Sequence, residues 1–81
     1  IATYKKIIEK YKNEPQYSIF IEDIARNLKP AHELGMKTVW IINDEPWAAE
    51  FSNSSFINYK TDKLSKFLKE INESRWTWKN N

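Results

Sequence analysis

The sequence predicts an α/β fold built on a partial parallel sheet of two or three strands with flanking helices, in the order α-β-α-β-(β)-α. Two short runs, 17–21 and 37–42, are rich in β-branched and aromatic residues and are apolar on both faces, as covered strands are. A helical segment lies between them, and such strand-helix-strand units are nearly always parallel. Two or three strands are few for a parallel sheet, which favours the C-terminal part of a larger domain.

Composition narrows the class of protein. The 81 residues are enough for one small domain, and 41 % hydrophobic residues exclude a disordered chain. The absence of cysteine excludes a disulfide framework, and a single glycine excludes a Gly-rich phosphate loop. The net charge of +2 is too small to indicate nucleic acid, and no apolar run is long enough to cross a membrane. With no signal-peptide pattern, we expect a cytoplasmic protein without nucleic acid or membrane partners.

Helical spacing appears first near the N-terminus. Residues 2–13 are expected to form an amphipathic helix, because apolar side chains recur at i, i+3, i+4 and i+7, namely Tyr4, Ile7, Ile8 and Tyr11. Pro15 ends this segment, since the residue before a proline avoids the helical region. The strand at 17–21 follows.

A second helix is expected at 28–34. Asn27 is placed as its N-cap, and Gly35 falls where a left-handed residue ends a helix. Leu28, Ala31 and Leu34 form its expected buried stripe. After the strand at 37–42, we expect a loop at 43–55 with a short packed turn, a weaker strand at 56–59 and a final helix at 62–72.

Two adjacent carboxylates, Glu22 and Asp23, follow the first apolar strand. In open parallel sheets, ligands bind beyond the carboxyl ends of the strands. Two neighbouring acids repel each other there, and Mg²⁺ relieves the repulsion because it prefers carboxylate oxygens and keeps several waters. Since side chains alternate along a strand, only one of the pair can point straight at such an ion. The alternative for an isolated pair is that the acids merely end a strand.

The stretch 19–40, which reads IFIEDIARNLKPAHELGMKTVW, resembles the last conserved motif of haloacid dehalogenase (HAD) superfamily phosphatases, and is most similar to their pyrimidine 5′-nucleotidase branch. The shared pattern is an apolar strand, two acids, a turn with Asn, a helix with Ala, and Leu-Gly-Met before the next strand. The resemblance is dense over residues 17–42 and looser toward both ends. It implies a Rossmann-like hydrolase core, of which residues 1–81 form a C-terminal fragment and residues 75–81 a tail.

This resemblance implies a Mg²⁺-dependent phosphatase that hydrolyses phosphomonoesters, with nucleoside monophosphates as substrates. In such enzymes an Asp nucleophile attacks phosphorus, a second Asp acts as general acid and base, and the phosphorylated small molecule is the partner. The acids of this motif complete the metal site. The resemblance implies that Asp23 binds Mg²⁺ directly and that Glu22 binds it through water or orients the site. Asn27 is expected to cap the following helix and to shape the site indirectly.

The chain also lacks residues that the family pattern requires for catalysis. No Asp-x-Asp occurs in the 81 residues, and the family's phosphate-binding Lys would fall just before Ile1, so this piece is expected to be inactive alone. The alternative is a catalytically silent α/β module that binds a partner, or a truncated gene product. In the family, the strand of the acid pair lies beside the nucleophile strand. Without that neighbour we expect an open edge at 17–21, and either self-association through it or coverage by the tail.

Overall fold

The computed structural model describes residues 5–9, 11 and 14–72. Its centre is a four-stranded sheet in the order β1-β2-β3-β4, formed by Lys5–Glu9, Ser18–Glu22, Lys37–Ile41 and Tyr59–Thr61. β2, β3 and β4 run parallel, and β1 runs antiparallel to β2. The predicted α/β class is found, but the sheet has four strands instead of two or three. None of the described helices is long and apolar enough to span a membrane.

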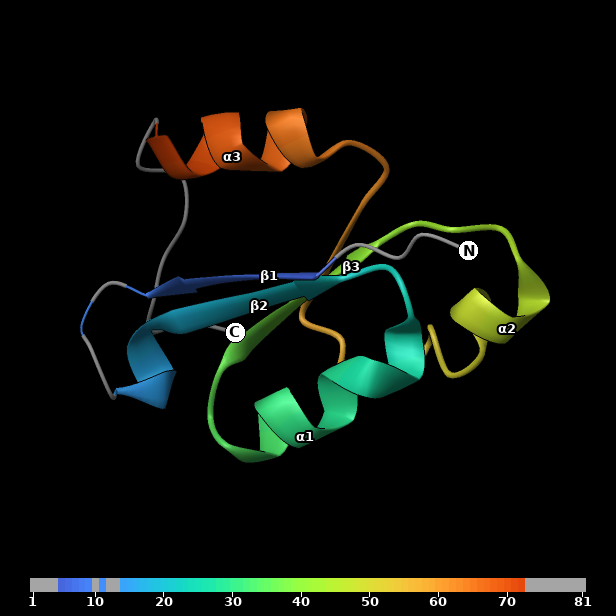
Figure 1. Ribbon diagram of the computed structural model, residues 1–81, viewed down its shortest axis with the longest axis horizontal. Coiled ribbons are helices and arrows are strands. Elements are labelled where there is room, and N and C mark those ends of the chain that lie inside the picture. The colour runs from blue at the N-terminus through green and yellow to red at the C-terminus, as the bar shows by residue number, and fades with distance from the viewer. Residues whose placement is uncertain (1–4, 10, 12–13, 73–81) are drawn as a thin grey trace.

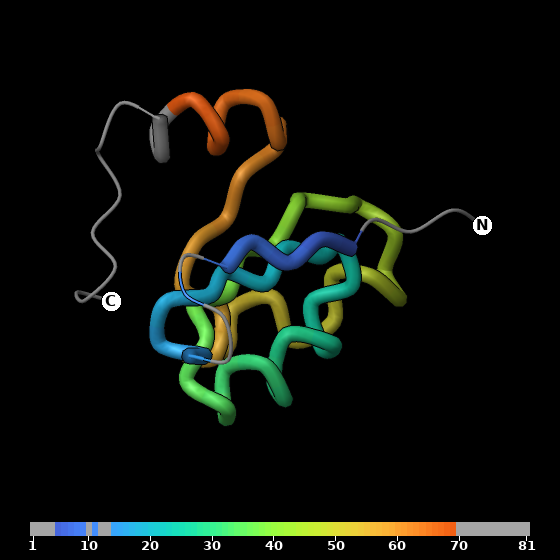
Figure 2. Tube along the Cα trace, turned by 60° about the vertical axis from the view of Figure 1, so that its left-hand side comes forward, coloured from blue at the N-terminus to red at the C-terminus, as the bar shows by residue number. Residues whose placement is uncertain are grey.

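Helices cover both faces of the sheet. α1 (Leu28–Glu33) and α2 (Pro46–Ala49) lie on one side and α3 (Leu64–Asn72) on the other, as Figure 1 and the turned view in Figure 2 both show. Two small cores result. The core under α3 contains Ile19, Ile21, Val39 and Phe67. The core under α1 contains Phe20, Ala25, Leu28, Ala31 and Trp40. Because β2 and β3 are covered on both faces, their apolar residues run continuously instead of alternating.

The predicted strand-helix-strand unit is confirmed. β2 and β3 pair in parallel, and a 3-10 turn, η2 (Ala25–Asn27), leads into α1. Gly35 has a φ of +95°, so it ends the helix in the left-handed conformation that glycine adopts most readily. The predicted burial of Leu34 is wrong, because this side chain is 64 % exposed. The helix ends at Glu33, and the chain is already turning toward β3 at Leu34.

The amphipathic helix predicted over residues 2–13 is wrong where the structure describes this segment. Lys5–Glu9 form β1 instead, paired antiparallel with β2. Ile7 and Ile8 are β-branched and suit a strand as well as a helix. The free edge of an apolar strand offers unpaired backbone groups along its length, and pairing with it outweighs a weak local helix preference. β2 is therefore flanked on both sides within the chain, and the predicted open edge at 17–21 is also wrong.

The C-terminal part follows the predicted order with shifted boundaries. The strand expected at 56–59 is β4 at Tyr59–Thr61, and the helix expected from residue 62 begins at Leu64. Asn58 is bound to Thr38 of β3: its side-chain Oδ1 accepts from the Thr38 N–H at 2.9 Å, and its own N–H donates to the Thr38 hydroxyl at 2.9 Å. These bonds hold Asn58 just before β4, so the pairing of β4 with β3 begins at Tyr59. The predicted tail at 75–81 lies outside the described residues.

Candidate functional site

The acid pair lies at the carboxyl end of β2, where the sequence places it. Glu22 is the last residue of β2, opposite Trp40 of β3, and Asp23 follows it. Both residues are buried, with only 4 % of Glu22 and 7 % of Asp23 exposed. Because β2 and β3 are parallel, the residues that follow both strands meet at the same rim of the sheet.

Asp23 is held by groups from β3 and from the loop after it. The indole Nε1 of Trp40 donates to the backbone oxygen of Asp23 at 2.8 Å. The side-chain amide of Asn43 donates to Asp23 Oδ2 at 3.2 Å, and its oxygen accepts from the Glu45 N–H at 3.0 Å, which orients the amide. Asn43 is a site residue that the sequence pattern did not predict. The available signal was its position as the first polar residue after the second apolar run.

One carboxylate oxygen of Glu22 lacks the kind of hydrogen bond that Asp23 Oδ2 receives from Asn43. Its Oε2 is buried and has no hydrogen-bond partner, and Glu22 forms no ion pair with a described residue. Burial raises the pKa of Glu22 above its usual 4.5, and the Asp23 charge raises it further. A hydrogen bond with the Asn27 side chain and the charges of Lys5 and Arg26 act in the opposite direction. A buried carboxylate oxygen without a partner is costly, and either a proton or a cation relieves that cost.

Asn27 takes the N-cap position of α1, as predicted, but its side chain does not cap the helix. Its backbone is already helical, with φ −73° and ψ −9°, and its side chain makes no capping hydrogen bond. η2 runs directly into α1, so the extended residue that normally presents a capping side chain is absent at this position. The Asn27 side chain instead acts on the acid pair, because it lowers the pKa of Glu22.

The donor set suits a hard cation that keeps most of its water. Mg²⁺ is commonly held by one or two carboxylates, and the rim offers those of Glu22 and Asp23. The part of the chain that the structure describes contains no group of three or more His, Cys, Asp or Glu side chains, so it forms no site built wholly from such ligands.

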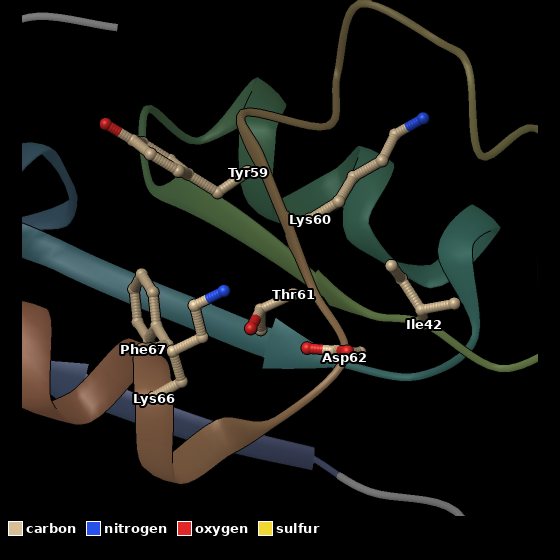
Figure 3. A pocket seen from close by; sticks show the side chains of 7 residues that line it. All are labelled: Ile42, Tyr59, Lys60, Thr61, Asp62, Lys66 and Phe67. Carbon is tan, nitrogen blue, oxygen red and sulfur yellow. The ribbon is translucent and has the colours of Figure 1, made fainter.

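A pocket of about 350 Å³ lies farther along the same rim, beside β4. Lys66 and Phe67 line it from α3, and β4 and its flanks supply the other side (Figure 3). Its two lysines do not converge: Lys60 points away from Lys66 in Figure 3 and donates to Asn53 Oδ1 at 2.9 Å. Because phosphate binding requires converging donors, this pocket is not a phosphate clamp in its present arrangement.

Fold and site together define a small mixed α/β protein whose central parallel strand ends in a buried acid pair. No protein-family model matches the chain, and no solved structure matches it significantly.

Proposed function

We propose that this chain is the metal-binding C-terminal portion of a Mg²⁺-dependent HAD-type phosphatase, which hydrolyses phosphomonoesters. The observation that supports it most is the buried, unpartnered Oε2 of Glu22, next to Asp23 at the carboxyl rim of the sheet. Adjacent buried acids favour a cation, since either charge alone is costly to remove from water. The resemblance over residues 19–40 supplies the reaction class, with nucleoside monophosphates as the substrates.

In this proposal each residue has its own task. Asp23 provides the direct metal ligand, and Asn43 orients the Asp23 carboxylate through the 3.2 Å bond. Glu22 binds a water of the ion, and Asn27 positions Glu22. Mg²⁺, when bound, neutralises charge on the phosphoryl oxygens. The nucleophile belongs to another part of the complete enzyme, because these 81 residues contain no Asp-x-Asp.

A second candidate is a catalytically silent α/β module, and the placement of β1 favours it. In the phosphatase proposal, the nucleophile strand takes the edge of β2 that β1 occupies in this structure. Because β1 already pairs with this edge of β2, a nucleophile strand cannot pair there in this arrangement. The two candidates differ in the coding sequence before Ile1. The phosphatase proposal requires a Lys there and an Asp-x-Asp much farther upstream, and the silent module requires neither.

Metal binding is tested on the ¹⁵N-labelled chain by titration with Mn²⁺ as a paramagnetic substitute for Mg²⁺. We expect selective broadening of the amide signals of Glu22, Asp23 and Asn43, reversed by excess Mg²⁺. Affinity rises with pH, because a proton on Glu22, whose pKa is raised, competes with the ion. Uniform broadening, or the same broadening in Asp23→Asn, would contradict the proposed site.

Asp44→Asn is the matched control, since Asp44 is exposed and lies just past the rim. It removes the same charge and leaves the broadening unchanged. Asp23→Asn is expected to fold normally, because the Asn side chain still accepts from Asn43. A loss of more than about 2 kcal/mol in unfolding free energy without metal would make Asp23 a structural residue.

Activity is tested on the complete protein encoded by the gene, with p-nitrophenyl phosphate and Mg²⁺. Removal of the orienting amide by Asn43→Ala should lower activity about tenfold, and Asp23→Ala should lower it further. Turnover that is unchanged in both variants would overturn the phosphatase proposal.

A further inference from the structure

A pocket on the α1 side of the sheet combines two cations with two aromatic rings. It has a volume of about 150 Å³ and is lined by Arg26, Lys29, Phe51 and Phe56. Arg26 belongs to η2 and Lys29 to α1, whereas Phe51 and Phe56 lie in the segment after α2. α1 and α2 lie on the same side of the sheet in Figure 1. No acid lines this pocket, so its described lining is positively charged.

Phe51 has a backbone conformation that the fold alone does not explain. Its φ is +66°, in the left-handed region that glycine normally occupies just after a helix. Gly35 meets the same requirement after α1 with a φ of +95°. After α2 the chain places a bulky aromatic residue there instead. Its side chain is 58 % exposed, so it gains little from burial. A strained and exposed aromatic residue beside a pocket is typical of a binding site.

The two cations differ in how they are held. Arg26 Nη1 donates to the backbone oxygen of Trp47 at 2.8 Å, which fixes the guanidinium against α2. Its contact with Glu50, at 3.9 Å between two half-exposed groups, is weak. Lys29 is exposed and has no carboxylate partner among the described residues. The pocket thus has one positioned cation and one whose charge is not neutralised nearby.

We propose that this pocket binds a small aromatic carboxylate, a single six-membered ring carrying one negative charge. A cavity of about 150 Å³ holds one benzene-sized ring, which sets the size. Phe51 and Phe56 offer aromatic surfaces for ring packing, and Arg26 and Lys29 offer charge-assisted donors for the carboxylate. The inference does not rest on the metal site, because none of the four lining residues is a proposed metal ligand.

The test is an NMR titration of the ¹⁵N-labelled 81-residue chain with benzoate. We expect saturable shifts at the amides of Arg26, Lys29 and Phe51. Cyclohexanecarboxylate, which has the charge without the aromatic ring, should bind about fivefold more weakly. Benzyl alcohol, which has the ring without the charge, should also bind more weakly. Shifts that do not saturate, or equal affinity for all three probes, would overturn the proposal.

Two variants sharpen the result. Phe51→Leu keeps an apolar side chain and removes the ring, so benzoate affinity should fall about fivefold. Lys29→Gln is an exposed change that leaves the fold intact, and affinity should fall about threefold. Lys66→Gln, beside the pocket at β4, is the matched control and should leave benzoate affinity unchanged. Benzoate affinity that is unchanged in both Phe51→Leu and Lys29→Gln would place the binding elsewhere and contradict the inference.

Discussion

Two strands flank β2, and they are attached to it in different ways. β3 pairs in parallel, contributes Val39 and Trp40 to the two cores, and also buries Thr38. β1 pairs antiparallel along its whole length, yet only Ile8 is partly buried and Ile7 is 50 % exposed. Backbone pairing is similar on the two sides, but apolar burial is not. Helix coverage, more than strand pairing, therefore stabilises this sheet, because exchanging water for protein hydrogen bonds yields a small net gain.

β1 also contributes electrostatically to the site. The Lys5 ammonium lies 5.6 Å from the centre of the Phe20 ring, within the range of a cation–π interaction. Lys5 is paired with Glu22 in the ladder, and its charge lowers the Glu22 pKa. Charged residues along β1 also discourage pairing of its outer edge with other chains. β1 therefore modifies the electrostatics of the site in addition to pairing with β2.

The largest effect is expected for a core change in β2. Ile21 is fully buried in the core under α3, so Ile21→Ala removes its contacts and leaves a cavity. We expect the free energy of unfolding to fall by about 3 kcal/mol, measured by urea denaturation. A loss below about 1 kcal/mol would mean that this core is not closely packed.

The next effect concerns the link between β3 and β4. The Thr38 side chain is fully buried, accepts from the Asn58 N–H and donates to the backbone oxygen of Phe56. Thr38→Val removes the donor to the Phe56 backbone oxygen and leaves the Asn58 N–H with only the Thr38 backbone oxygen as acceptor, so it should cost about 2 kcal/mol in urea denaturation. Thr61→Val is the control, because the Thr61 hydroxyl bonds only within an exposed turn. Equal losses in the two variants would refute the buried link.

A smaller effect follows the protonation of Glu22. Because the folded chain raises the pKa of Glu22 above 4.5, it holds this proton more tightly than the unfolded chain does. Without metal, the free energy of unfolding should therefore decrease as pH rises from 4.5 through the raised pKa, and then level off. Glu22→Gln should lose this dependence and exceed the parent in stability at neutral pH. Glu14→Gln, at an exposed position, should keep the pH dependence of the parent and should not exceed its stability. A parent whose stability rises over the same pH window would contradict this assignment.

The smallest effect is expected on the β1 side. Ile7→Ala is the counterpart of Ile21→Ala, and since Ile7 is half exposed we expect a loss below about 0.5 kcal/mol. Amide hydrogen exchange should be faster in β1 than in β3. A loss equal to that of Ile21→Ala would show that the β1 side stabilises the fold as much as the core under α3 does. Self-association through residues 17–21 requires β1 to leave this edge, so a dimer formed through it would have β1 displaced.

Local signals explain what could be predicted. The unit of β2, α1 and β3 has two continuous apolar runs, and Gly35 marks the end of its helix. The location of the acid pair follows from the same unit, since Glu22 and Asp23 come directly after the first run. β1 could not be predicted in this way, because its apolar spacing satisfies a helix too. Asn43 was missed because it lies 20 residues from Asp23 in the sequence.

Local sequence features alone specify the strand-helix-strand unit and the position of two acids at its rim. These features depend on side-chain periodicity, β-branched residues and one glycine, all of which act over a few neighbouring residues. Packing between distant segments makes residues 5–9 a strand, brings Asn43 to Asp23, and places Phe51 in one pocket with two cations. The physical reason is that the free edge of β2, the shared rim and the facing loop exist only once distant segments pack together.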